Sequence, residues 1–121
     1  MSFITHLLSV LDGIKVYHWS TKIYARHKAS DELHSSLSKL TDQFVEIYLG
    51  EQNKRPHFDV EHDIIKLYDC TDDESMEELK KFAAWLKTDL KEIAGDSLSL
   101  NHIVEEMSSA AHQAMYLFTF S

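Results

Sequence analysis

Five side chains of types that bind metal ions occur at helical spacing in the first half of this 121-residue sequence. His18 stands first, and two pairs follow whose members lie four residues apart, His27 with Asp31 and Asp42 with Glu46. Because residues four apart lie above one another on a helix, each pair would share one face. Imidazoles mixed with carboxylates suit iron or another first-row metal, and suit zinc when fewer groups bind.

The two pairs form a polar stripe beside the apolar face of one predicted helix. Counting about 100° per residue from Leu37, they fall at about 80° to 180°, whereas the core residues fall at about −80° to −20°. Each polar residue taken alone is most simply explained by a solvated face. A solvated face would not be expected to carry Tyr24, Val45 and Leu49 as well, so we interpret the stripe as a contact surface.

The length of this helix limits what the stripe can do within one chain. At a rise of about 1.5 Å per residue, His27 and Glu46 are nearly 30 Å apart, too far to bind one ion. However, His27 and Glu46 lie equally far from one midpoint, as do Asp31 and Asp42. If two copies pack antiparallel about a twofold axis at that midpoint, His27 of one copy faces Glu46 of the other, and Asp31 faces Asp42. The spacing therefore predicts at least a homodimer through this helix. His18, at the end of the preceding helix, could supply a second imidazole to each site.

Helical periodicity organises the first half of the chain. Apolar residues recur at steps of three and four from Phe3 to His18, with Ser2 as the expected cap. They recur again from about Ile23 to Leu49, and Gly50 is expected to stop this second helix. Because only Trp19 to Lys22 separate them, we expect the two helices to be antiparallel neighbours.

The second half predicts two more helices after a long connection. An apolar patch at residues 64–68 predicts a short helix within that connection. Thr71–Glu74 has the pattern of a capping box, which opens a third helix that Gly95 ends. A fourth helix opens at Ser97 or Ser99.

This connectivity predicts an all-α fold in a single domain spanning residues 1–121. Short turns join helices one to two and three to four, and a long crossover carrying a short helix joins helices two and three. That order is typical of a ferritin-like four-helix bundle rather than a simple up-and-down bundle.

Composition excludes several classes of protein. The formal net charge of −8 disfavours binding to nucleic acid or to an anionic membrane. The single cysteine rules out an intrachain disulfide framework and fits a reducing, cytoplasmic compartment. No apolar run approaches the ~20 residues needed to span a bilayer.

The candidate ligands resemble those of the Dps family of mini-ferritins. The matching residues are His18-Trp19, His27, Asp31, Asp42, Glu46 and Leu49-Gly50. The resemblance implies a ferroxidase site between two subunits, built from two His and one Asp of one chain and the second Asp and Glu of the other. It implies Fe(II) as the metal, oxidised by oxygen or peroxide. The sequence differs from the family in a shorter stretch between the two histidines, in Ile47 where the family has Arg, and in lacking a basic tail.

The sequence also resembles small ferritin-like proteins encoded by phages and other viruses, which would place it in the host cytoplasm. We therefore expect a metal-binding protein that takes up Fe(II), or zinc or another divalent metal, between two subunits. The alternative is a non-catalytic dimeric helical module, such as a viral accessory protein, whose polar stripe is an interface without metal. His34, close to the same face, fits interfacial packing better than ligation, and DNA binding is the least favoured function.

Overall fold

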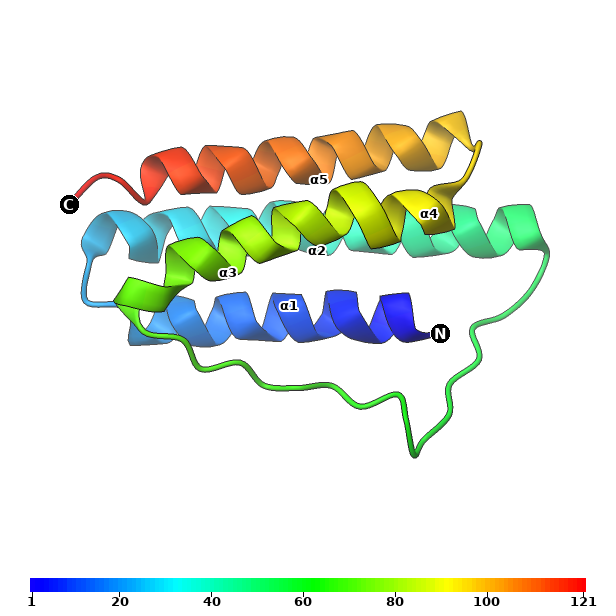
Figure 1. The fold of residues 1–121 in the computed structure, drawn as a ribbon, viewed down its shortest axis with the longest axis horizontal. Coiled ribbons are helices and arrows are strands. Elements are labelled where there is room, and N and C mark those ends of the chain that lie inside the picture. The colour runs from blue at the N-terminus through cyan, green and yellow to red at the C-terminus, as the bar shows by residue number, and fades with distance from the viewer.

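Two long antiparallel helices, α1 (Ser2–Ser20) and α2 (Tyr24–Gln52), carry all five candidate ligands. The other helical segments are α3 (Asp72–Trp85), the π-helical η1 (Leu86–Leu90), α4 (Lys91–Ala94) and α5 (Leu98–Leu117). The computed structural model describes residues 1–121 and contains no strand (Figure 1). The all-α prediction is confirmed, and α3, η1 and α4 follow one another as one rod.

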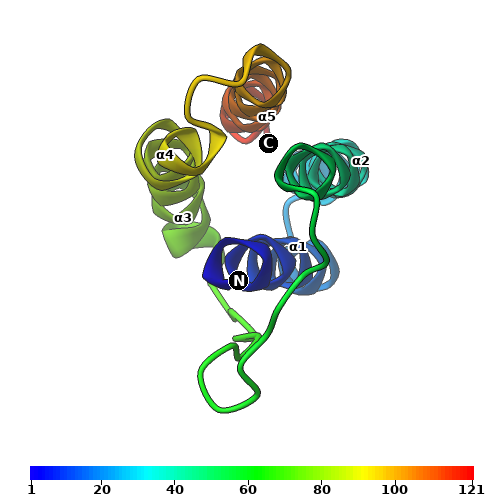
Figure 2. The same cartoon turned by 90° about the vertical axis from the view of Figure 1, so that its right-hand side faces the viewer.

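The helices form a four-cornered bundle. α1 packs mainly against α2, α2 against α5, and α5 against the α3–α4 rod. Viewed end-on, the rod lies at the corner opposite α2 (Figure 2). Residues 53–71 return the chain along the length of the bundle, on the outer side of α1 (Figure 1). None of the helices combines the length and apolar character that crossing a bilayer requires.

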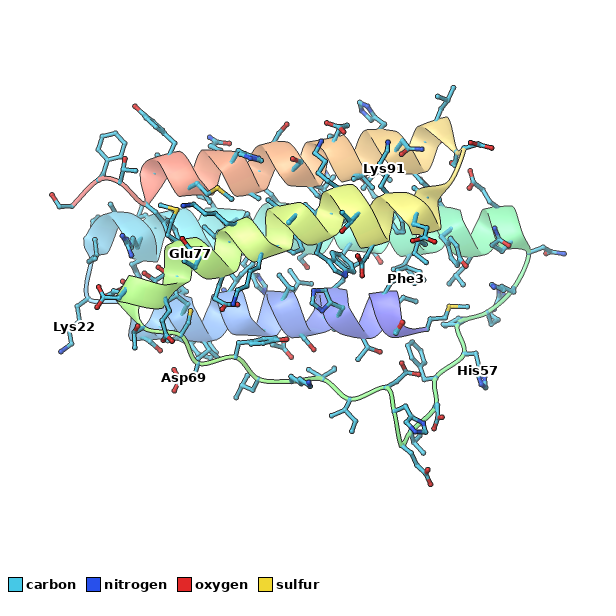
Figure 3. All side chains as sticks on the ribbon, viewed as in Figure 1. Phe3, Lys22, His57, Asp69, Glu77 and Lys91 are labelled. Atoms are coloured by element: carbon cyan, nitrogen blue, oxygen red, sulfur yellow. The ribbon has the colours of Figure 1, made fainter.

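The core is built from the apolar stripes of all four corners. Phe44, Leu86 and Met107 are completely buried, and Phe3 meets Phe44 edge-to-face at 5.9 Å between ring centroids. Each such side chain contributes about 1.5–3 kcal/mol by leaving water. Figure 3 shows Phe3 inside the bundle. These contacts hold α1 and α2 in fixed register, which in turn fixes the candidate ligands on both helices.

The π-helical turn changes which residues face the core after it. Continuing the apolar spacing of Leu86 and Leu90 along the helix would place Ile93 inward, but Ile93 is 37% exposed, whereas Ala94 is 4% exposed. A π turn inserts an extra residue and so rotates the following helix face. The apolar spacing before the insertion therefore does not continue through it.

Two predicted helix boundaries are wrong. Ser2 already lies in α1, with Met1 at the cap position and no side-chain cap. Gly50 does not stop α2, which continues to Gln52 and ends where Asn53 takes the left-handed conformation, φ 52°. A glycine inside a helix costs only about 1 kcal/mol relative to alanine, so the helix continues through it until Asn53 supplies the left-handed cap.

The short helix predicted at residues 64–68 is absent, and this stretch runs along α1 without regular secondary structure (Figure 1). The Lys66 amide donates to the Ser9 hydroxyl at 3.0 Å, and the Thr5 hydroxyl donates to Asp63 at 3.3 Å. Hydrogen bonds to α1 thus replace those of a local helix. Figure 3 shows His57 and Asp69 outside the bundle on this crossover.

The other predicted boundaries are confirmed. Thr71 and Glu74 form the reciprocal capping box at the start of α3. Gly95, with φ of 57°, ends the rod, and the Ser97 hydroxyl accepts from the Leu100 amide to cap α5.

Candidate metal centre

His18 at the end of α1 and His27 near the start of α2 form a reciprocal pair. The His18 Nδ1 lies 2.6 Å from the His27 carbonyl oxygen, and the His27 Nδ1 lies 2.8 Å from the His18 carbonyl oxygen. The two rings stack with centroids 4.0 Å apart and planes 14° apart. The two histidine rings thus lie side by side, on either side of the short turn that joins α1 to α2.

These hydrogen bonds decide which ring nitrogen is available. A carbonyl oxygen only accepts, so Nδ1 must donate in both His18 and His27. In the neutral imidazole this leaves the lone pair on Nε2. Metal-binding histidines commonly donate their other N–H to a backbone carbonyl in this way, which fixes the ring and its tautomer. Both Nε2 atoms therefore have no hydrogen bond within the chain and could act as metal ligands.

A tight turn places the pair. Thr21 takes an extended conformation, and its amide donates to the Tyr17 carbonyl to end α1. The Thr21 hydroxyl then accepts from the Ile23 amide at 3.2 Å, just before α2 begins. This turn folds α2 back so that its first turns lie beside the last turn of α1.

Asp31 lies one turn beyond His27 and faces the same cluster. Its Oδ1 is 4.0 Å from the His18 Nε2, a span that two ligands about 2 Å from a shared ion can cover. The same Oδ1 accepts from the Lys15 ammonium at 3.2 Å. This hydrogen bond is the largest cause of a lowered pKa at Asp31, with the charges of Lys15 and both histidines adding to it. Asp31 is therefore ionised at neutral pH and already paired with the Lys15 ammonium.

Asp42 and Glu46 form a second, separate group further along α2. Both are exposed. A hydrogen bond with Asp42, together with its negative charge, raises the pKa of Glu46. Two carboxylates that repel each other in this way would be stabilised by a cation between them.

One chain keeps these two groups apart. Asp31 and Asp42 are separated by about 16 Å along α2. No three His, Cys, Asp or Glu side chains of one chain gather closely enough to hold a metal ion. The structure places His18, His27 and Asp31 near one another at one end of α2 and Asp42 with Glu46 further along it, and neither group by itself is close enough to form a metal site.

A groove of about 840 Å³ between α1 and α2 connects the two groups. Asp31 and Asp42 line it together with the half-exposed Leu8 and with His34. Burial is the main cause of the lowered pKa of His34, which is therefore neutral at pH 7. The groove combines apolar and polar side chains, as contact surfaces between proteins do.

The groove also contains the one buried side-chain polar atom without a hydrogen bond, the Thr41 Oγ1. A buried hydroxyl without a partner costs about 1–3 kcal/mol. A second molecule lying in the groove could supply that partner.

Two further residues contribute to this region, and the sequence pattern did not indicate a role for either of them. Lys15 reaches Asp31 across the α1–α2 interface. Arg26, next to His27, donates to the Asp72 carbonyl at 2.6 Å and the Phe118 carbonyl at 3.1 Å, and its guanidinium lies 5.3 Å above the Phe118 ring. These partners come from α3 and the end of α5, so the first turn of α2 is fixed to the rest of the bundle.

The remaining histidine–carboxylate pairs lie away from this region. His62 meets Asp59 at 2.6 Å on the crossover, and His102 meets Glu106 at 2.7 Å on α5. All four side chains are largely exposed, so these are surface contacts of small energetic weight.

Comparison with known proteins gives relatives without a described activity. A family model described as a family of unknown function, DUF5856, matches residues 18–118. A protein of Enterobacteria phage T4, described as an uncharacterized 14.6 kDa protein in the mobD-ri intergenic region, is 33% identical over 84 residues. That match covers 64% of this chain and 66% of the phage protein, just under two thirds of its length. No solved structure matches the chain.

Proposed function

The chain belongs to the DUF5856 family of unknown function, and we propose that it is a ferritin-like protein that binds Fe(II) as its substrate between two copies. The observation that carries this proposal is the His18–His27 pair. Both rings donate from Nδ1 to a carbonyl, both keep Nε2 for a metal, and Asp31 lies within 4.0 Å of one of them.

The proposed dimer pairs the α1–α2 faces of two copies with their α2 helices antiparallel. His18, His27 and Asp31 of one copy would then share an ion with Asp42 and Glu46 of the other. A twofold axis produces two such sites. The groove between α1 and α2, its exposed Leu8 and the unpartnered Thr41 hydroxyl support this face as the contact.

The order of helices supports the ferritin-like part of the proposal. A short turn joins α1 to α2, a crossover along the whole bundle joins α2 to α3, and a short turn joins α4 to α5 (Figure 1). Ferritin-like bundles have one such long crossover.

The chemistry follows from the ligand types. Carboxylates favour the higher charge of Fe(III), whereas neutral imidazoles bind Fe(II) without adding charge. Each Fe(II) would give one electron to oxygen or peroxide supplied from solution. Zinc or another divalent ion could occupy the same ligands without this redox step.

Calorimetric titration with Fe(II) under nitrogen, combined with the native mass, tests this proposal. We expect a dimer or larger assembly that takes up Fe(II) in a fixed ratio to chains. His27→Ala should abolish the uptake, whereas His102→Ala, which removes an exposed histidine on α5, should leave it unchanged. A monomer that takes up no Fe(II) would contradict the proposal.

A second candidate function is favoured by the Lys15–Asp31 ion pair. At 3.2 Å, Lys15 already supplies Asp31 with a positive partner. The same face could then be a dimer contact without metal, in a non-catalytic module that acts as a viral accessory protein in the host cytoplasm. The similarity to a phage T4 protein supports the viral setting. Under this alternative, Asp42→Ala should keep the same melting temperature with and without added metal.

A further inference from the structure

A cavity of about 420 Å³ opens between α1, α3 and the last residues of the crossover. It arises because α1 packs mainly on α2 and the α3–α4 rod mainly on α5, so that α1 and α3 approach each other less closely. Figure 2 shows α1 and α3 at neighbouring corners of the bundle. The volume lies within the roughly 300–1,000 Å³ typical of small-molecule sites.

The walls of this cavity are rich in aromatic rings. The aromatic lining residues are His6, Tyr17, Tyr68, Phe82, Trp85 and Phe118. The His6 and Trp85 rings lie 4.3 Å apart, and Phe82 stacks at 18° to Trp85 with centroids 6.1 Å apart. Rings placed in this way can take another flat ring by stacking and edge contacts.

The interior of the cavity carries no charge. Its two charged lining residues, Glu78 and Lys81, form an ion pair with each other at 3.3 Å, and both side chains are more than 40% exposed. Burial is the main cause of the lowered pKa of His6 and of the raised pKa of the Cys70 thiol, so both groups are neutral at pH 7. A charged ligand would lose its hydration there without gaining a free counter-charge.

His6 also offers an open hydrogen-bonding position. It is half-buried, and its ring nitrogens make no hydrogen bond within the chain, unlike the paired His18 and His27. A single polar group in an apolar wall is what orients a ligand in many small-molecule sites. Directly after Trp85 the rod becomes π-helical, a local distortion that is frequent at functional sites.

We propose that this cavity binds a small uncharged molecule built on an aromatic ring, oriented by a hydrogen bond to the His6 imidazole. The site is lined mainly by α1, α3 and the crossover, together with Ser30 and Leu33 of α2 and Phe118, and none of the proposed metal ligands lines it. Its test therefore does not depend on metal binding.

The neutral dye N-phenyl-1-naphthylamine tests the site, in the presence of a metal chelator. The assay uses the Trp19→Phe protein, in which Trp85 on the cavity wall is the remaining tryptophan. We expect one dye per chain, with a rise in dye emission and a matching loss of Trp85 emission. The anionic dye 1-anilinonaphthalene-8-sulfonate should bind at least about tenfold more weakly, because its charge must be desolvated.

A matched pair of variants locates the dye. Val10→Phe fills the cavity, whereas Val16→Phe adds the same volume on α1 outside the cavity. We expect Val10→Phe to weaken dye binding by about tenfold and Val16→Phe to leave it within about twofold. A circular dichroism melt checks that both fold, and Ile14→Phe replaces Val10→Phe if that variant does not. Wild-type dye affinity in the folded cavity-filling variants, or equal affinity for the two dyes, would overturn the proposal.

Discussion

The carboxylate of Asp72, the first residue of α3, accepts a hydrogen bond of 2.7 Å from the Tyr17 hydroxyl near the end of α1. The Thr21 hydroxyl donates to the same oxygen. Together these bonds close one end of the bundle, where the α1–α2 turn meets the end of the crossover. They lie next to the His18–His27 pair, so the geometry of the pair depends on them.

Asp72→Asn should therefore make the protein less stable and less sensitive to acid. Hydrogen bonds from Thr21 and Tyr17 lower the pKa of Asp72 below 3.8, its ordinary value. The stabilisation is thus fully present above that ordinary pKa and is lost as the pH falls through the lower folded-state pKa. Because the site is open to solvent, we expect a loss of about 1 kcal/mol at pH 7.

Urea unfolding at pH 7 and at pH 3 measures this effect. Asp73→Asn is the control, since it removes one negative charge from the same helix turn at an exposed position. Asp72→Asn should lose stability at pH 7 and lose less on acidification than the wild type. Equal unfolding free energies for the two variants would contradict the role given to Asp72.

Thr41→Val should stabilise the isolated chain. The substitution removes a buried hydroxyl that has no hydrogen-bond partner and keeps the branched shape of the side chain. We expect the free energy of unfolding to rise by about 1 kcal/mol. Thr88→Val is the control, because its hydroxyl donates to the Ala84 carbonyl at 2.9 Å, and this variant should gain nothing.

The same Thr41→Val variant also reports on the groove. If a second copy satisfies the hydroxyl, the substitution should weaken dimerisation, which sedimentation at a series of protein concentrations measures. A variant that is less stable as a monomer would show that the Thr41 hydroxyl has a partner within the chain.

Lys15→Met should raise the pKa of Asp31 and strengthen metal binding at the proposed site. The Lys15 hydrogen bond is the main reason that the pKa of Asp31 is lowered, and the Lys15 ammonium occupies the oxygen nearest His18. Because the pair is partly exposed, we expect a roughly two- to fivefold gain in Zn(II) affinity. Lys28→Met, which removes an exposed unpaired lysine from α2, should change the affinity less. Weaker binding in Lys15→Met would mean that the lysine positions Asp31 rather than competing with the metal.

Local signals in the sequence predict most helix boundaries. The capping box at Thr71–Glu74, the glycine at 95 and the serine at 97 act within a few residues, so their effect can be read without the rest of the fold. The path of the crossover depends instead on two hydrogen bonds with α1, in which the Lys66 amide donates to Ser9 and Asp63 accepts from Thr5, and no local pattern contains these partners. The π turn could not be predicted from the sequence either. The apolar residues before it and those after it each keep ordinary helical spacing, so neither segment alone reveals the inserted residue.

In the candidate site, too, contacts within one helix could be predicted from the sequence, whereas contacts between helices could not. Spacing along one helix predicts that His27 and Asp31 share a face, because both positions belong to α2. That His18 joins them depends on the turn at Thr21, and the roles of Lys15 and Arg26 depend on partners from other helices. Helical periodicity describes one rod at a time, so contacts between rods could not be predicted from it.

The ring of His6 lies 4.3 Å from that of Trp85, so protonation of His6 should change Trp85 fluorescence. Burial, the largest cause, lowers the pKa of His6 below 6.5, its ordinary value, while the charge of Asp89 partly opposes this. In the Trp19→Phe protein we expect emission to titrate with a midpoint below pH 6.5, because an imidazolium beside the indole quenches it more than neutral imidazole does. Between the folded-state pKa and 6.5 the unfolded chain binds more protons, so stability should rise with pH in that interval.

His6→Gln in the same background is the control for this titration, since it removes the titrating ring and keeps a polar side chain. Its Trp85 emission should stay flat between pH 5 and pH 7, the interval in which histidine ordinarily changes charge. Fluorescence isolates His6 here, whereas the pH dependence of stability also includes His34, whose pKa is lowered mainly by burial as well. A midpoint at or above 6.5, or a titration that survives His6→Gln, would show that His6 is not desolvated against Trp85, and the neutral interior assigned to the cavity would then be wrong.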